Sequence, residues 1–125
     1  MTRGSTRILV VDDNPANLRL AEFLLTSSGF EVHTVRSGPD AIELATRLRP
    51  SLILMDIQLP GMDGFVATAQ LKENPKTSGI PVVAMTAFAM RGDEDRARQA
   101  GCDGYLSKPI DPATFVSSVT SYLAG

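Results

Sequence analysis

Polar residues that could do chemistry follow four short apolar runs of the chain. Asp12 and Asp13 follow the first run, Asp56 the second, Thr86 the third and Lys108 the fourth. Carboxylates at about 4 Å repel one another by roughly 1 to 4 kcal/mol, so three at one place call for a cation. Carboxylate oxygens suit Mg²⁺, which prefers partners that also hold phosphate. One carboxylate left partly free could attack phosphorus and form an acyl phosphate, with Lys108 as the amine that neutralises the developing charge.

These residues meet only if the apolar runs are parallel strands of one sheet. Five β-prone runs alternate with amphipathic segments, which predicts an α/β fold: a doubly wound five-stranded parallel sheet flanked by five helices. Several runs are apolar on both faces, as strands covered on each side must be. In such open sheets ligands bind beyond the carboxyl ends of the strands, where these polar residues stand. The predicted strands are Arg7–Val11, Glu31–Val35, Ser51–Met55, Pro81–Met85 and Gly104–Ser107.

The amphipathic segments carry start and stop signals of helices. Glu94 and Arg98, in the fourth and most polar segment, can pair at i,i+4. The predicted helices open at Asn14-Pro15 and end before Gly29, run near 39–49, run from the cap Asp63 to about Glu73, lie around 92–100, and open at the cap Asp111-Pro112.

Length and composition limit the class of protein. A chain of 125 residues has room for one domain, expected at residues 7–125 after a flexible leader at 1–6, and for no output domain. Its aliphatic runs are far shorter than the roughly 18 residues of a membrane span. The net charge of −2 is too weak and too mixed to indicate a nucleic-acid or membrane surface. The single Cys102 cannot form an internal disulfide, which favours a cytoplasmic protein.

Four sequence blocks, in order, resemble the response regulator receiver domain, and the resemblance covers essentially residues 7–123. Within that family, the stretch 87–94 and the lack of an output domain are most similar to DivK-type single-domain regulators and to receivers of hybrid histidine kinases. The resemblance implies the strand order 2-1-3-4-5, known from the chemotaxis member CheY, with the switch point between the first and third strands. The blocks are Ile8–Asn14 (ILVVDDN), Leu52–Gly64 (LILMDIQLPGMDG), Val82–Ala87 (VVAMTA) and Leu106–Pro109 (LSKP).

The resemblance implies a phosphorylation-dependent signalling switch of a two-component system or phosphorelay, not a conventional enzyme. Asp56 would accept a phosphoryl group from a phosphohistidine on a sensor histidine kinase or a histidine phosphotransfer protein. Asp13, Asp56 and the main-chain carbonyl of Gln58 would bind Mg²⁺ or Mn²⁺, with Asp12 reaching it through water. The side chains of Gln58 and Phe88 would flank the phosphoryl group.

The resemblance also implies a switch between two surface states. Thr86 would move its hydroxyl onto a phosphoryl oxygen, leaving space for Tyr105 to turn inward. Lys108 would pair with phosphoryl oxygens, and the Lys108–Pro109 bond would be cis. The fourth helix, fifth strand and fifth helix would then present a changed surface to a downstream protein, in a monomer or weak homodimer.

Structural roles compete with these interpretations. Asp-Asp pairs, Asp63 and Asp111 are typical of helix caps. Tyr105 could be only a packing residue, His33 is expected to be a partly exposed strand residue, and Cys102 to be inert.

Two alternative functions stay open. The first is an enzyme on this topology, such as an aspartyl-phosphate phosphatase or a nucleotide-binding protein. Against it, the sequence has no GxxxxGK[ST] loop, no GxGxxG after the first strand and no DxD at a strand end. The second is an internal receiver of a hybrid kinase, with the same chemistry in another context.

Overall fold

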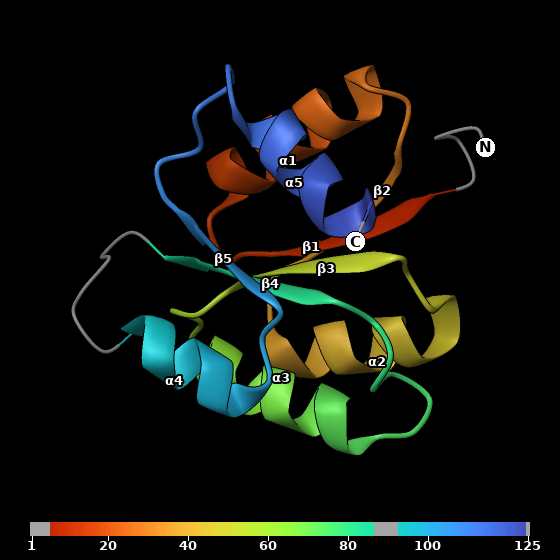
Figure 1. Cartoon of the computed structure of the whole chain (residues 1–125), viewed down its shortest axis with the longest axis vertical. Helices are drawn as coiled ribbons and strands as arrows, with labels where there is room; N and C mark the ends of the chain where they lie inside the picture. Colours follow the sequence, from red (N-terminus) through yellow and green to blue (C-terminus); the bar gives the residue numbers. More distant parts are fainter. Residues whose placement is uncertain (1–5, 87–92, 125) are drawn as a thin grey trace.

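The structure, a computed structural model, describes residues 6–86 and 93–124, which form a parallel sheet between two layers of helices (Figure 1). The strand order is β2-β1-β3-β4-β5, so the order implied by the resemblance is confirmed. Helices α1 and α5 cover one face of the sheet, and α2, α3 and α4 cover the other (Figure 1). The strands are β1 (Arg7–Val11), β2 (Glu31–Val35), β3 (Leu52–Asp56), β4 (Val82–Thr86) and β5 (Gly104–Ser107).

Two strands lie one residue later than the sequence predicts. The prediction ended β3 at Met55 and β4 at Met85, but Asp56 and Thr86 are themselves the last strand residues. Asp56 is the register partner of Met85 in β4, and Thr86 is the partner of Ser107 in β5. Asp56 and Thr86 are therefore held by backbone pairing with the neighbouring strands and do not belong to the loops that follow.

The helices are α1 (Pro15–Ser27), α2 (Gly38–Leu48), α3 (Gly64–Glu73), α4 (Asp93–Ala100) and α5 (Phe115–Ala124). The predicted caps of α1 and α3 are confirmed: Asn14 accepts from Ala16 N at 2.8 Å, and Asp63 accepts from Val66 N at 2.9 Å. The predicted start of α4 at Gly92 falls outside the described residues.

The ends of two helices were predicted wrongly. Helix α2 ends at Leu48, and Arg49 is its C-cap in the left-handed conformation, with φ 49° and ψ 64°. Pro50 follows and has no N–H to continue the helical hydrogen bonds. Helix α5 begins at Phe115, three residues after the predicted first residue, Pro112. Asp111 caps a turn before the helix instead, and its carboxylate accepts from Ala113 N at 3.0 Å.

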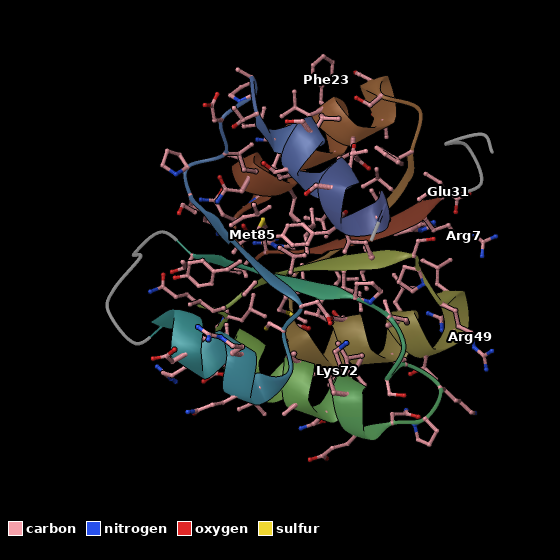
Figure 2. The ribbon with its side chains drawn as sticks, in the orientation of Figure 1. Arg7, Phe23, Glu31, Arg49, Lys72 and Met85 are labelled. Carbon is pink, nitrogen blue, oxygen red and sulfur yellow. The ribbon has the colours of Figure 1, made fainter. Side chains whose placement is uncertain are left out.

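The core lies on both faces of the sheet, because alternate residues of each strand point to opposite sides. Ile8 and Val10 pack toward α1 and α5, whereas Leu9 and Val11 pack toward α2 and α3, and all four are buried. Met85 lies in the interior in the same way (Figure 2). The apolar side chains on the two faces of the sheet hold the strands in a fixed register. A site built from residues at the strand ends needs this fixed register.

Residues assigned to structural roles are placed as follows. His33 lies in β2, 35% of its side chain is exposed, and its ring nitrogen is 2.7 Å from Glu31. Cys102 is half-buried, with its sulfur 3.9 Å from the Thr68 hydroxyl. The Glu94 side chain lies outside the described residues, and Arg98 pairs with Asp95 at 3.1 Å.

Among the described residues, no helix has the length and apolar character needed to cross a membrane.

Candidate functional site

Asp12 lies directly after β1 and is fully buried. The backbone N–H of Asp12 donates to the Val35 carbonyl at 3.2 Å, which continues the pairing between β1 and β2. One carboxylate oxygen accepts from Asn14 N at 2.9 Å, so the side chain closes the turn that leads into α1. The other oxygen accepts from Lys108 Nζ at 2.7 Å.

Asp56 ends β3, the neighbour of β1, and only 3% of the residue is exposed. Its Oδ1 accepts from Gln58 N at 3.0 Å, and its Oδ2 lies 3.0 Å from Lys108 Nζ. Burial raises the pKa of Asp56 above its ordinary value, against the opposing hydrogen bonds from Gln58 N–H and Lys108. The cost of ionising this carboxylate makes it sensitive to any cation that binds beside it.

Lys108 joins the two carboxylates across the sheet. Its backbone N–H donates to the Thr86 carbonyl at 2.6 Å, which fixes the start of the chain beyond β5. Burial acts to lower the pKa of Lys108, but the hydrogen bonds to Asp12 and Asp56 outweigh it, so the pKa lies above the ordinary lysine value. The side chain is therefore a charged ammonium, 12% exposed. The peptide bond between Lys108 and Pro109 is cis.

Asp13 completes an acidic cluster with Asp12 and Asp56. One oxygen of each of the three carboxylates lies within 4.8 Å of the others. Three carboxylates face one ion-paired ammonium, which leaves two negative charges unmatched within the group. Hard oxygen donors with surplus negative charge fit Mg²⁺ and do not fit a thiophilic metal. Gln58, the fourth predicted ligand, is exposed in the turn after Asp56.

Thr86 and Tyr105 lie on the strands farther along the sheet. Thr86 is fully buried and follows Met85, the register partner of Asp56. Tyr105, in β5, is the register partner of Ala84 in β4. It packs with Ala84 and Ala97 on the face of the sheet that α3 and α4 cover. Thr86 lies two residues after Ala84 in β4, so these two share a face of the sheet. Tyr105 is the register partner of Ala84 and therefore lies on that face too. Phe88 lies outside the described residues.

Two residues at this edge were missed by the sequence analysis. Gly64 N donates to the Ile57 carbonyl at 3.1 Å, and a Cβ at Gly64 would collide with the Asp56 carbonyl oxygen. Only glycine allows α3 to begin this close to the acid site. Arg36, after β2, donates from Nη2 to the Asp13 carbonyl at 3.0 Å. Gly64 ends one of the quoted sequence blocks, whereas Arg36 carries no local signal.

The carboxyl ends of β1, β3 and β4 lie together at the left of the sheet in Figure 1, at the strand-order switch point between β1 and β3. Residues 8–120 match the response regulator receiver domain family. The protein belongs to this family. It is a receiver domain of two-component signalling, with the CheY-like fold. A DivK polar-differentiation response regulator of Brucella anthropi is 47% identical over 116 residues, which cover 93% of this chain and 94% of the relative.

Solved receiver structures have the same architecture. A putative response regulator of Chloroflexus aurantiacus has a TM-score of 0.90 at 29% identity, covering 96% of this chain and 98% of its own. The receiver domain of the sensor histidine kinase PA1611 of Pseudomonas aeruginosa has a TM-score of 0.88 at 36% identity, with the same coverage of 96% and 98%. That structure holds a magnesium ion in its active-site cleft. Magnesium binding is a property of receiver domains, and the acidic cluster has the donors for it.

Proposed function

We propose that this receiver domain is a phosphoryl-accepting switch with Asp56 as the acceptor. The observation that carries the proposal is the surroundings of the buried Asp56 carboxylate. It lies 3.0 Å from the Lys108 ammonium and within 4.8 Å of carboxylate oxygens of Asp12 and Asp13. The donor would be a phosphohistidine of a sensor histidine kinase or a histidine phosphotransfer protein. A cytoplasmic location, expected from the single cysteine, is part of the same proposal.

Asp13, Asp56 and the Gln58 carbonyl would hold Mg²⁺, with Asp12 reaching it through water. The ion would supply positive charge for the phosphoryl oxygens and lower the cost of an ionised Asp56. A carboxylate oxygen of Asp56 attacks phosphorus, the new O–P bond forms, and the N–P bond of the phosphohistidine breaks with its electron pair on the imidazole. Lys108 stays on Asp12 and turns its other hydrogen bond from Asp56 to a phosphoryl oxygen.

Thr86 and Tyr105 would transmit the new charge to the surface of α4, β5 and α5. One new hydroxyl hydrogen bond to the charged phosphoryl group favours the phosphorylated state by roughly 1.5 to 3 kcal/mol, whereas the lysine–phosphoryl contact replaces the one that Lys108 makes with Asp56. Helix α4 is weakly anchored: among its residues with described side chains, Ala97 alone is buried. A cavity of about 340 Å³ between α4, β5 and α5 is lined by residues that include Ala97, Tyr105 and Tyr122. This surface is where a downstream protein would bind.

The test is direct phosphorylation with Mg²⁺ and acetyl phosphate, followed by intact-mass measurement. We expect a gain of one phosphoryl mass in the wild type and none in Asp56→Asn. Beryllofluoride should shift the NMR signals of Thr86 and Tyr105 in the wild type only. Equal labelling of Asp56→Asn would rule out Asp56 as the acceptor, and multiple turnover of a nucleotide or sugar phosphate would favour the enzyme.

Asp63→Asn is the matched control for this substitution. It makes the same chemical change seven positions along the chain, and asparagine caps a helix as well as aspartate does. We expect Asp63→Asn to be phosphorylated like the wild type. Loss of labelling in both variants would mean that the substitutions act through folding.

A further inference from the structure

Asp13 is held differently from the other two carboxylates of the acidic cluster. The carboxylates of Asp12 and Asp56 each accept a backbone N–H and contact Lys108. Across residues 6–86 and 93–124, no group donates a hydrogen bond to the Asp13 carboxylate, and none forms an ion pair with it. Asp13 is instead held through its backbone, because its carbonyl oxygen accepts a hydrogen bond from Arg36 Nη2 at 3.0 Å.

The position of Arg36 is itself fixed by the fold. The residue directly follows β2, whose last residue, Val35, is the register partner of Val11 and accepts from Asp12 N. On its other side, Ser37 caps α2 by accepting from Asp40 N at 3.2 Å. The backbone on either side of Arg36 is therefore anchored, so its exposed side chain starts from a fixed point beside the acid site.

We propose that Arg36 is a positioning residue of the metal site. By holding the Asp13 peptide, the guanidinium orients the Asp13 carboxylate toward Asp12 and Asp56 without forming an ion pair that would compete with a cation. Groups that orient a ligand in this way affect metal affinity without touching the metal. The inference rests on the proposed function, because it assumes that Asp13 is a ligand of Mg²⁺.

Charge and positioning predict opposite results when Arg36 is removed. A guanidinium near the site repels a divalent cation, so loss of its charge alone would tighten metal binding. Loss of positioning removes one of the two hydrogen bonds on the peptide between Asp13 and Asn14, whose N–H still donates to Asp12. The Asp13 carboxylate is then less well ordered, and part of the binding free energy is spent on ordering it. The sign of the change in Mg²⁺ affinity therefore separates the two effects.

The experiment is calorimetric titration of Mg²⁺ into the wild type, Arg36→Ala and Arg36→Lys, with Arg47→Ala as the control. Arg47 is an exposed arginine of α2 that pairs with Glu43. We expect Arg36→Ala to raise the Kd for Mg²⁺ by about three- to tenfold. Arg36→Lys, which keeps a donor and the charge, should stay within about twofold of the wild type, and Arg47→Ala should bind like it.

A double-mutant cycle tests whether Arg36 acts through Asp13. If it does, Arg36→Ala weakens Mg²⁺ binding in the wild type but adds little in an Asp13→Asn background. The amide NMR signals of Asp13 and Asn14 should also shift in metal-free Arg36→Ala while its thermal midpoint stays unchanged.

Unchanged or tighter Mg²⁺ binding by Arg36→Ala, with the wild type binding normally, would overturn the role of Arg36 and leave the proposed function intact. Equal losses in the two backgrounds would likewise overturn it. A wild type that binds no Mg²⁺ would instead defeat the proposed metal site, and the role of Arg36 with it.

Discussion

Two lysine–carboxylate groups lie at opposite edges of the sheet, and they differ in how completely their charges are matched. At the edge where β4 and β5 begin, Lys72 meets Asp103 one to one at 2.9 Å. Lys72 points from α3 toward the sheet (Figure 2), and its ammonium also donates to the Ile80 carbonyl at 2.8 Å. The same Asp103 oxygen accepts from Val82 N at 2.8 Å, so this group ties α3 to the start of β4.

At the edge where the strands end, one ammonium serves two carboxylates. Lys108 contacts both Asp12 and Asp56, and Asp13 adds a third negative charge within 4.8 Å. This group is also more buried: the Lys108 side chain is 12% exposed and that of Lys72 is 20% exposed. Hydrogen bonds or ion pairs hold the side chains of Lys72, Asp103, Lys108, Asp12 and Asp56, whereas the Asp13 carboxylate has no such partner among the described residues. Of these two groups, the one with Lys108 therefore keeps surplus negative charge.

The difference shows how one chemical pair can serve structure at one edge and function at the other. A matched pair with its spare donors on backbone carbonyls holds two elements together and has no capacity for a ligand. A cluster with more carboxylates than cations is less stable alone and gains stability when a cation binds. The stoichiometry of the pair, not its residue types, distinguishes the two edges.

Removal of Lys108 should produce the largest effect on stability. In Lys108→Ala, Asp12 and Asp56 stay buried beside each other without their cation, so we expect a loss of about 3 kcal/mol in the free energy of unfolding. Urea unfolding in the presence of a chelator measures this loss, and added Mg²⁺ should restore part of it. Lys76→Ala, at an exposed lysine, is the control and should be near neutral. A loss smaller than that of Lys72→Ala would break the comparison.

Removal of Lys72 should cost less and should leave the chemistry unchanged. We expect Lys72→Ala to lose about 2 kcal/mol, because Asp103 is half exposed and can be solvated when its partner is absent. Calorimetric Mg²⁺ titration and acetyl phosphate labelling should give wild-type results. A weaker Mg²⁺ affinity in this variant would show that the two edges are coupled through β4 and β5.

Much of the fold could be predicted from the sequence, because strands such as Ile8–Val11 are apolar on both faces and caps such as Asn14 are local signals. Strand order was different. It came from the resemblance, since the pairing of β1 with β3 depends on packing between distant segments. The strand ends at Asp56 and Thr86 were displaced by one residue because neighbouring strands, which local sequence does not show, extend the ladder.

The site could be predicted only where its residues end apolar runs. Lys108 is 96 residues from Asp12, yet both stand at strand ends, and the sheet brings them together. Arg36 was not predictable, because an exposed arginine after a strand resembles any solvated charge. Its role depends on a hydrogen bond to Asp13, 23 residues away, and no periodicity or spacing encodes that contact.

Asp56→Asn should change the free energy of unfolding less than removal of either lysine, and should raise it where they lower it. A neutral amide removes the cost of a buried charge, so we expect a gain of about 1 kcal/mol at neutral pH without Mg²⁺. Asp103→Asn breaks a matched pair and should lose stability instead. Added Mg²⁺ should stabilise the wild type more than Asp56→Asn and so reduce or reverse the gain.

The dependence on pH follows from the raised pKa of Asp56, whose largest cause is burial. A group with a raised pKa in the folded state contributes stability that is fully present below its unfolded pKa and is lost as pH rises through its folded pKa. The advantage of Asp56→Asn over the wild type should therefore be absent below the ordinary aspartate value and should grow as pH rises above it. Urea unfolding of both proteins across this range, with a chelator present, measures the difference. An advantage that is constant with pH would mean that it comes from packing or hydrogen bonding and not from the charge of Asp56, and surplus charge would then no longer distinguish the two edges.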